Sequence, residues 1–358
     1  MKKNTIPKLP IIELSAEEIK RKKDLMSDEV QQIIIKEDLI ETIEAYSRAS
    51  FQARKIGQAA KLYYKQTKEE TGIIWSMAGS LFGAGLRQIT IDCIRDNLVD
   101  VLVCTGALFE QDMLEALGHK HYIYDSEIDD SELQRLGIDR VYDHLLDEMA
   151  LRQVDLTFKK ISSEMSEGYY SSREYMKFVG KWLSSSDSVK DSVAQAAYEH
   201  KIPIFIPAIN DSSLGIGIAM NKNSNRGGIG IDVIKDLREI AQLKSECGNT
   251  GIIVIGGGVP KNYAQDAVVM AEMLGHQVNK HKFGIQISTA DVRDGGLSGS
   301  TLKEAISWGK NDSEMEEVMV WGEATVYIPL LMGYVMQKNK NQVRPKRCFS
   351  DIFRDDRI

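Results

Sequence analysis

The stretch Gly251-Ile-Ile-Val-Ile-Gly-Gly-Gly258 decides the fold of this chain, because an unbroken apolar run ends in three glycines. Continuous rather than alternating hydrophobicity is typical of a strand covered on both faces, as in a parallel sheet. Four other short runs share this character, at residues 99–104, 202–206, 283–287 and 318–321. Helix-like stretches such as 187–200 and 233–245 separate the runs. This alternation predicts a doubly wound α/β fold, Rossmann-like, with helices on both faces of a mostly parallel sheet.

The parts on either side of the alternating region differ from it. Residues 17–68 are charged, free of proline and preceded by Ser15 as a candidate N-cap, so we expect a helical extension over residues 1–70. The α/β domain is then expected over 71–338 and a C-terminal tail over 339–358. Residues 125–170 contain no strong strand signal and are expected to be an excursion of helix and loop. The stretch 338–346, rich in Lys and Arg, is expected to be exposed.

Bulk composition excludes several classes of protein. A net charge of −7 over 358 residues disfavours a general nucleic-acid surface and is compatible with a cationic substrate. No window approaches the roughly 18 uninterrupted apolar residues of a membrane span. The N-terminus lacks an apolar secretory segment, so we expect a cytoplasmic protein. The 4 cysteines and 6 histidines match no metal-ligand spacing, so no metal site is expected.

Glycine and polar residues follow all five apolar runs, and ligands of open parallel sheets bind beyond the carboxyl ends of the strands. Three consecutive glycines let backbone N–H groups approach a phosphate closely, although a tight turn without ligand explains that triplet equally well. The five strand ends together favour a nucleotide-type ligand. No P-loop or GxSxG elbow is present, and Gly83-Ala-Gly85 lacks the third glycine of the dinucleotide fingerprint, with Gln88 in its place.

A second motif, Glu304-Ala-Ile-Ser-Trp-Gly-Lys310, places a lysine near an indole and a carboxylate. A lysine normally titrates near about 10.4, and only its neutral amine is a nucleophile. Shielding from water would favour that neutral form. On spacing alone, an ordinary surface lysine after a helix explains the motif as well.

Several long motifs in one order resemble the deoxyhypusine synthase family, from about residue 77 to about residue 336. They are Met77-Ala-Gly-Ser-Leu-Phe-Gly-Ala-Gly-Leu-Arg87, Ile202-Pro-Ile-Phe-Ile-Pro-Ala-Ile-Asn-Asp-Ser-Ser-Leu-Gly215, Asp232-Val-Ile-Lys-Asp-Leu-Arg238, Gly256-Gly-Gly-Val and Glu304-Ala-Ile-Ser-Trp-Gly-Lys310. The resemblance implies a Rossmann-like fold that binds NAD, in a homotetramer whose active sites are shared across a subunit interface. It also implies oxidation of spermidine by NAD and transfer of an aminobutyl group, through an imine on an enzyme lysine, to a lysine of a translation factor.

The resemblance assigns roles to individual residues. Lys310 falls on the imine-forming lysine, and Trp308 and Glu304 would offer a cation–π face and a counter-charge to the amine. Positions associated with substrate are Glu110, Asn262, Gly295, Gly296, Glu304 and Trp308. Positions associated with NAD are Ser80, Thr105, Gly106, Gln111, Asp211, Gly257, Thr289, Asp294, Glu323 and Ala324.

The sequence departs from the family pattern where substrate is held. Ile216 and Leu297 stand where the family has acids, and Asn262 stands where a histidine is usual. Gln111 replaces a glutamate, and Glu323 replaces an aspartate associated with the cofactor. Each lost charge-assisted contact would forfeit roughly 1.5–3 kcal/mol.

Three functions therefore remain open. The first is a deoxyhypusine synthase-like transfer of an aminoalkyl group to a protein lysine. The second is a polyamine synthase with a small amine acceptor, giving homospermidine or a related product. The third is an NAD-binding regulatory protein without turnover. The family also has an N-terminal segment that covers a neighbouring subunit's active site, and residues 2–14 are its candidate here, although a mobile terminus explains them as well.

Overall fold

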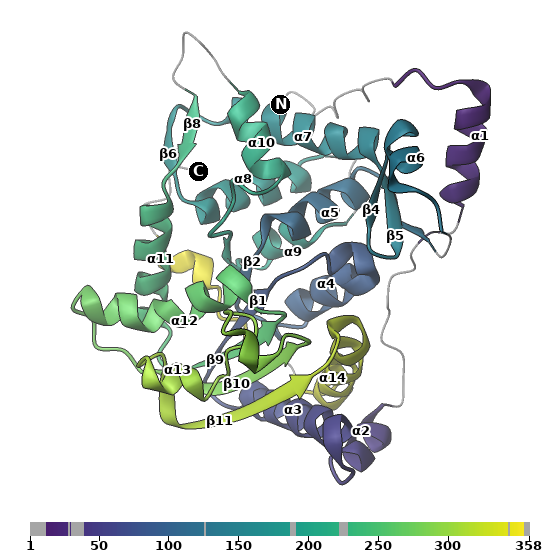
Figure 1. The fold of residues 1–358 in the computed structure, drawn as a ribbon. Coiled ribbons are helices and arrows are strands. Elements are labelled where there is room, and N and C mark those ends of the chain that lie inside the picture. Colours follow the sequence, from purple (N-terminus) through teal and green to yellow (C-terminus); the bar gives the residue numbers. More distant parts are fainter. Residues whose placement is uncertain are drawn as a thin grey trace.

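A six-stranded, wholly parallel sheet lies at the centre of the protein (Figure 1). The computed structural model describes residues 12–27, 29, 39–124, 127–186, 191–221, 228–342 and 344–353. The strand order is β11-β10-β9-β1-β2-β7. These strands span Gly72–Met77 (β1), Val101–Cys104 (β2), Ile204–Phe205 (β7), Thr250–Ile255 (β9), His281–Ser288 (β10) and Asn311–Trp321 (β11).

Read from β7, the strands follow the order 3-2-1-4-5-6 of the doubly wound dinucleotide-binding fold, so the predicted fold class is confirmed. The order reverses between β1 and β9, and the crevice at such a switch point is where these folds bind ligands. The sequence prediction missed β1, the strand at this position. Ser76 interrupts its run, and Trp75 is fully buried with its indole N–H donating to the Tyr63 hydroxyl at 2.7 Å.

Successive residues of β1 enter two different hydrophobic clusters, which shows that both faces of the sheet are covered. Ile73 and Trp75 pack in the cluster that includes α3 and α14, whereas Ile74 packs in the cluster that includes α11 and α12. The covering helices are α3 (Phe51–Lys68), α4 (Arg87–Arg95), α11 (Val233–Glu246), α12 (Gly258–Met273) and α14 (Ala324–Asn339). No helix within the described ranges is both long and apolar enough to span a membrane.

The predicted N-terminal helices are present as α1 (Ala16–Leu25), α2 (Ile40–Tyr46) and α3. Ser15 caps α1 as predicted, because its hydroxyl accepts the N–H of Glu18 while the Glu18 carboxylate accepts the N–H of Ser15. The segment 2–14 was the candidate for covering a neighbouring active site, and its residues 2–11 are not among those that the structure describes. In the same way, residues 187–190 of one expected helix are not described, and α9 (Val193–Glu199) begins after them.

The region expected to lack strands contains a small antiparallel sheet in the order β3-β5-β4, and that expectation was wrong. Its strands span Tyr122–Ile123 (β3), Ile138–Val141 (β4) and His144–Asp147 (β5). They are too short and too mixed in polarity to give a clear run. A parallel pair, β6 (Gly168–Tyr170) and β8 (Ile229–Ile231), lies at the upper left of Figure 1. The helices of this part are α5 (Gly106–Ala116), α6 (Asp130–Arg135), α7 (Glu148–Glu164), α8 (Ser172–Ser184), α9 and α10 (Ser213–Met220).

The prediction of an exposed stretch at 338–346 is corrected at Arg344. Its guanidinium is 5% exposed and is held by Asp100, with nitrogen–oxygen distances of 2.9 and 2.6 Å. Beyond it, Phe349 and Phe353 join the cluster around α11 and α12 through the short turn η3 (Phe349–Ile352). A basic residue in a charged stretch gave no sign of burial because its partner lies 244 residues away.

Candidate active site

A cavity of about 460 Å³ surrounds the predicted lysine. It is lined by residues of α12, of the segment 295–300 and of the short helix α13 (Glu304–Ser307) with the turn after it. All the predicted substrate residues except Glu110 line it: Asn262, Gly295, Gly296, Glu304 and Trp308, together with Lys310. A single chain therefore brings Lys310 together with all the predicted substrate residues except Glu110.

Lys310 lies between the end of α13 and the start of β11. Gly309 has a φ of 74°, which lets the chain reverse so that the Lys310 N–H donates to the Ala305 carbonyl at 3.1 Å. The Lys310 side chain is 12% exposed, and its Nζ lies 5.5 Å from the centre of the Trp308 ring. The turn thus directs the ammonium into the cavity, under an indole face that attracts cations.

Two oxygens from α12 hold the Lys310 Nζ. Asn262 Oδ1 accepts a hydrogen bond from it at 2.7 Å, and Asp266 Oδ1 lies 2.8 Å from it. Sequence reasoning missed Asp266. The available signal was its position four residues after Asn262, which places both side chains on one face of a helix.

A second lysine, Lys261, fixes the segment that forms one wall of the cavity. It is 1% exposed, and its Nζ donates to the Leu297 carbonyl at 3.1 Å, to the Ser300 hydroxyl at 2.8 Å and to the Ser300 carbonyl. Burial lowers the pKa of Lys261 to about 8. Its three N–H groups are used by these oxygens, so Lys261 positions the loop.

A second cavity, of about 350 Å³, lies beyond the carboxyl ends of β1, β9, β10 and β11. Four predicted cofactor residues line it: Gly257, Thr289, Glu323 and Ala324. Its shape depends on glycine, because a Cβ on Gly257 would lie 2.5 Å from the Cα of Ser298, and Gly256 and Gly258 have φ values of 84° and 62°. Since α12 begins at Gly258, the cavity presents the N–H groups of a helix N-terminus, which favour an anion such as phosphate.

The two cavities adjoin through shared elements. The first turns of α12 contribute Asn262 and Asp266 to the lysine cavity, and Gly257, at the N-cap of the same helix, lines the other. Between them runs the segment 297–300, whose Leu297 and Ser300 face the lysine and whose Ser298 faces the glycines. Ser298 is held to β10 by hydrogen bonds from Gln286 and Ser288 to its carbonyl, at 3.0 and 3.3 Å.

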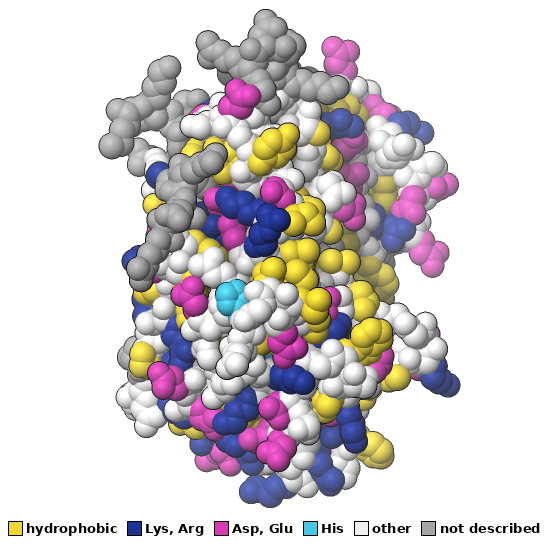
Figure 2. All heavy atoms as spheres, turned by 90° about the vertical axis from the view of Figure 1, so that its left-hand side faces the viewer, with side chains coloured by type: hydrophobic (Ala, Val, Ile, Leu, Met, Phe, Trp, Pro, Cys, Tyr) yellow, Lys and Arg dark blue, Asp and Glu magenta, His cyan; other side chains and the backbone are white. Residues whose placement is uncertain are grey.

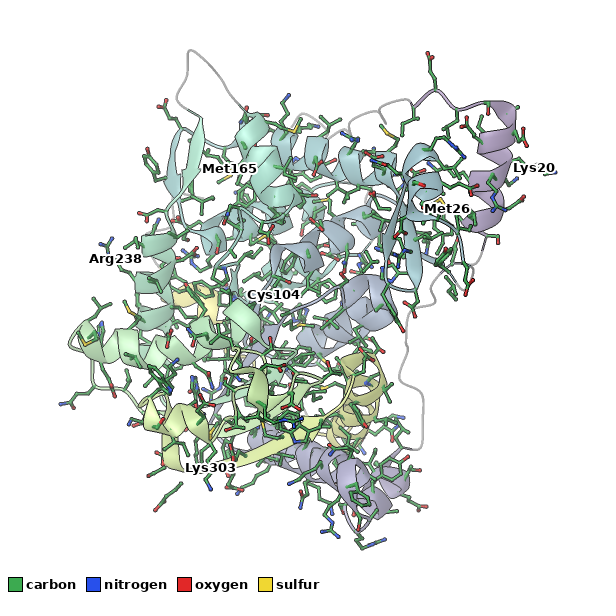
Figure 3. The ribbon with its side chains drawn as sticks, viewed as in Figure 1. Lys20, Met26, Cys104, Met165, Arg238 and Lys303 are labelled. Carbon is green, nitrogen blue, oxygen red and sulfur yellow. The ribbon has the colours of Figure 1, made fainter. Side chains whose placement is uncertain are left out.

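Other predicted residues line neither cavity. Ser80 lies between Gly79 and Leu81, which do line the glycine cavity, and Asp294 is exposed in the turn η2 (Val292–Asp294). A separate group follows β2 and β7 and consists of Thr105, Gly106, Glu110, Gln111 and Asp211. Figure 3 labels Cys104, the last residue of β2, near the middle of the molecule, whereas Lys303, which precedes α13, is labelled near its lower edge.

Two members of this separate group, Glu110 and Gln111, are held by internal hydrogen bonds. The Glu110 carboxylate accepts the N–H of Ser213 at 2.9 Å, at the start of α10, and burial raises the pKa of Glu110. Gln111 is buried, and its Oε1 accepts the N–H of Gly83 at 3.0 Å, in the turn between β1 and α4. Ile216, which replaces a family acid, is 48% exposed on α10 and does not line the lysine cavity. Leu297, the other replacement, does line it.

The protein has a doubly wound α/β fold with a glycine-lined cavity at its switch point and a lysine cavity beside it. Comparison with known families is more specific: the deoxyhypusine synthase model matches residues 41–335, and the chain belongs to this family. It is 45% identical over 321 residues to a "Deoxyhypusine synthase-like protein" of Chlorobaculum parvum, a match that covers 88% of this chain and 91% of the relative.

Other relatives agree with this assignment. A protein of the same description from Coxiella burnetii is 40% identical over 94% of this chain and 96% of its own. "Probable deoxyhypusine synthase 2" of Methanosarcina mazei is 37% identical, over 87% and 90%. Among solved structures, one from Entamoeba histolytica assigned as a deoxyhypusine synthase aligns with a TM-score of 0.56 at 18% identity, over 87% of this chain and 96% of that one. At that identity the likeness shows the fold alone.

Proposed function

We propose that this protein is an NAD-dependent transferase that moves an aminoalkyl group from a polyamine-type donor to an acceptor amine, through an imine on Lys310. The observation that carries the proposal is the placement of the Lys310 amine in a cavity with an indole and two carboxylates, next to a glycine-lined cleft at the switch point of the sheet. A lysine that only solubilised a surface would need neither neighbour.

The glycine-lined cleft fits a dinucleotide. Gly257 and Ala324 allow a close approach, the N-terminus of α12 suits the pyrophosphate, and Thr289 and Glu323 offer oxygens for ribose hydroxyls. NAD, when bound, supplies the redox step by taking a hydride from the donor carbon and returning it to the product. The chain's own residues bind the amine, orient it and shield it from water.

The lysine cavity fits a cationic amine with an aliphatic chain. Asp266 and Glu304 supply negative charge, Trp308 supplies a cation-binding face, and Val269, Leu297 and Ala305 supply apolar surface. Leu297 disfavours a second ammonium at its end of the cavity. Because position 297 is 43% exposed, loss of its acid should weaken spermidine a few-fold, and we expect a donor with fewer charges at that end.

Two kinds of amine are candidates to accept the aminoalkyl group from Lys310. A protein lysine is the acceptor that the family resemblance implies. A small amine acceptor, giving a homospermidine-type product, is the second candidate, and the apolar Leu297 favours it because a compact cavity lacking one acid suits a short diamine.

We also propose that a second copy of the chain completes each site, within a homotetramer. Trp308 is 66% exposed, which is unusual for an indole that holds substrate. Val233, Ile234 and Val259 are also exposed at the starts of α11 and α12, and hydrophobic side chains gather on that side of the molecule (Figure 2). A partner surface there would bring its own Asp211, which is exposed after β7, toward the lysine cavity.

Purified protein and NAD, incubated with labelled spermidine, putrescine or agmatine, test this function. We expect NADH formation or a labelled product with at least one amine, loss of both in Lys310→Ala, and retention of both in the control Lys303→Ala, an exposed lysine before α13. Label in an added protein would indicate a protein-lysine acceptor, and a new small amine would indicate a polyamine synthase. No turnover with any amine would support an NAD-binding regulatory protein instead.

A further inference from the structure

The first turns of α12 carry two side chains that contact the Lys310 amine, and they also contact each other. Asn262 Nδ2 donates to Asp266 Oδ2 at 2.6 Å, Asn262 Oδ1 accepts from Lys310 Nζ at 2.7 Å, and Asp266 Oδ1 lies 2.8 Å from the same nitrogen. We propose that Asp266 is the catalytic group that carries protons away from the Lys310 nitrogen during imine formation, and that Asn262 positions it. This inference rests on the proposed imine chemistry of Lys310.

The geometry favours a proton-transfer role for Asp266. A catalytic base must lie within about 2.6–3.2 Å of the atom that loses the proton, and Asp266 meets this condition. It is also the only carboxylate that the described part of the chain places within 4.0 Å of Lys310 Nζ. Because Asn262 holds the far oxygen of Asp266, the near oxygen is aimed at the lysine.

Asp266 is more exposed than Lys310, which suits a group that takes a proton from a shielded amine. Lys310 is 12% exposed, whereas Asp266 is 35% exposed. Asp266 therefore faces both the shielded amine and the open side of the cavity, where a leaving group departs. An ion pair that served only stability would gain little from such an exposed carboxylate.

The neighbouring charged groups do not offer a competing route. The Lys261 Nζ uses its N–H groups on the oxygens of Leu297 and Ser300, so it neither attacks substrate nor takes a proton. Glu304 lines the cavity but is exposed. Its position at the start of α13 suits a counter-charge for the amine substrate.

The proposed step balances in atoms and charge. Lys310 begins as an ammonium and gives one proton to Asp266, and the freed lone pair bonds to the electrophilic donor carbon. Asp266 passes this proton to the donor nitrogen, takes a second proton from Nζ and passes it on in the same way. The carbon–nitrogen bond of the donor, which starts as a neutral imine, then breaks, and the leaving group departs as a neutral amine. Lys310 remains as a protonated imine, and Asp266 is again a carboxylate.

The test omits NAD and the donor amine, so it is independent of the proposed overall reaction. The full-length protein is incubated with a simple aldehyde and cyanoborohydride, and the rate of alkylation at Lys310 is followed by mass spectrometry of peptides. Two protons leave Nζ here too, and the aldehyde oxygen departs as water. We expect Asp266→Asn and Asp266→Ala to slow alkylation by roughly 10²-fold, the low end for a positioned acid–base group. The control Glu272→Gln, on the same helix and exposed, should label at the wild-type rate.

Chemical rescue separates proton transfer from a structural effect. Formate or acetate should restore labelling of Asp266→Ala, with a rate that follows the basicity of the added carboxylate, and should not restore Asp266→Asn, whose amide fills the space. Asp266→Glu should keep part of the rate. Wild-type labelling in Asp266→Asn, or a loss in Asp266→Ala that no carboxylate rescues although its melting temperature is normal, would overturn the proposal. Asp266-dependent labelling in a protein that never forms NADH would instead leave this inference standing and refute the proposed transferase.

Discussion

The two halves of the sheet's carboxyl edge carry similar residues but use them differently. Beyond β9, β10 and β11, glycines and polar side chains line two adjoining cavities. Beyond β2 and β7, Glu110 accepts the N–H of Ser213, and Asp112 accepts the N–H groups of Val193 and Ala194 at the start of α9. In the first half most of these groups line a cavity, although Glu323 also caps α14 by accepting the N–H of Thr325 at 2.9 Å. In the second half Glu110 and Asp112 cap helices. A position at a strand end therefore does not by itself make a polar residue a site residue.

Removal of Asp112 should show the largest effect on the fold. The carboxylate is 1% exposed, pairs with Arg87 at 2.8 Å and caps α9. Asp112→Ala removes the nearest carboxylate from the buried Arg87 guanidinium and leaves Glu115 at 3.8 Å, so we expect a loss of about 3–5 kcal/mol in the free energy of unfolding. Urea denaturation measures it. A loss below about 1 kcal/mol, the size for an exposed pair, would show that this half is not built around its carboxylates.

A buried histidine at the amino edge of the sheet provides a third case, in which the contribution to stability depends on pH. His281 is fully buried between Thr250 and the Ala264 carbonyl, and burial lowers its pKa to about 3. Because the unfolded histidine binds a proton near pH 6.5, stability is complete above that pH and is lost as the pH falls toward 3. At pH 4 the loss should reach about 3 kcal/mol.

The matched measurement is the difference between the wild type and His281→Gln in urea denaturation at pH 7, 5.5 and 4. Asp236 opposes the trend, because burial raises its pKa to about 7, but this contribution is common to both proteins and cancels in the difference. An equal pH slope in the two proteins would show that His281 is not buried as a neutral group.

In the glycine-lined half, Gly257→Ala should act on the ligand more than on the fold. Its Cβ would lie 2.5 Å from the Ser298 backbone and would displace the segment between the two cavities. Overpacking of this kind costs about 1–3 kcal/mol, so NAD should bind roughly 10–100-fold more weakly in a calorimetric titration. Gly275→Ala, at a glycine with a φ of 88° whose added Cβ would meet no atom within 4 Å, controls for the effect of an added methyl group without overpacking and should keep the NAD affinity. Unchanged NAD binding in Gly257→Ala would place the dinucleotide elsewhere.

The smallest expected effect concerns the amine. Leu297→Asp restores an acid at a position that is 43% exposed, where a single ion pair contributes about 0.2–1 kcal/mol. Spermidine should then bind a few-fold more tightly, while a monoamine of equal length should bind with unchanged affinity. Equal gains for both amines would indicate a general charge effect and not an ammonium held at that point.

The sequence predicted the fold class correctly, and it brought the residues that line the lysine cavity to attention, because both depend on local patterns. Lys310, Trp308 and Glu304 lie within one motif, and the strands of the six-stranded sheet were visible as apolar runs except for β1, where Ser76 interrupts the run. The rest depended on packing between distant segments. Asp266 meets Lys310 only because α12 lies beside α13, and Glu110 is engaged by Ser213, 103 residues away. Arg344 gave no local sign of its buried partner Asp100.

The most direct test of the Lys310 chemistry is reductive trapping with the complete reaction. The protein, NAD and a panel of labelled amines are treated with borohydride, and the label is located by peptide mass spectrometry. We expect one amine to label Lys310 only when NAD is present, and no labelling in Lys310→Ala. Label on Lys261 or on any other residue, or a label that does not require NAD, would contradict the proposed imine on Lys310.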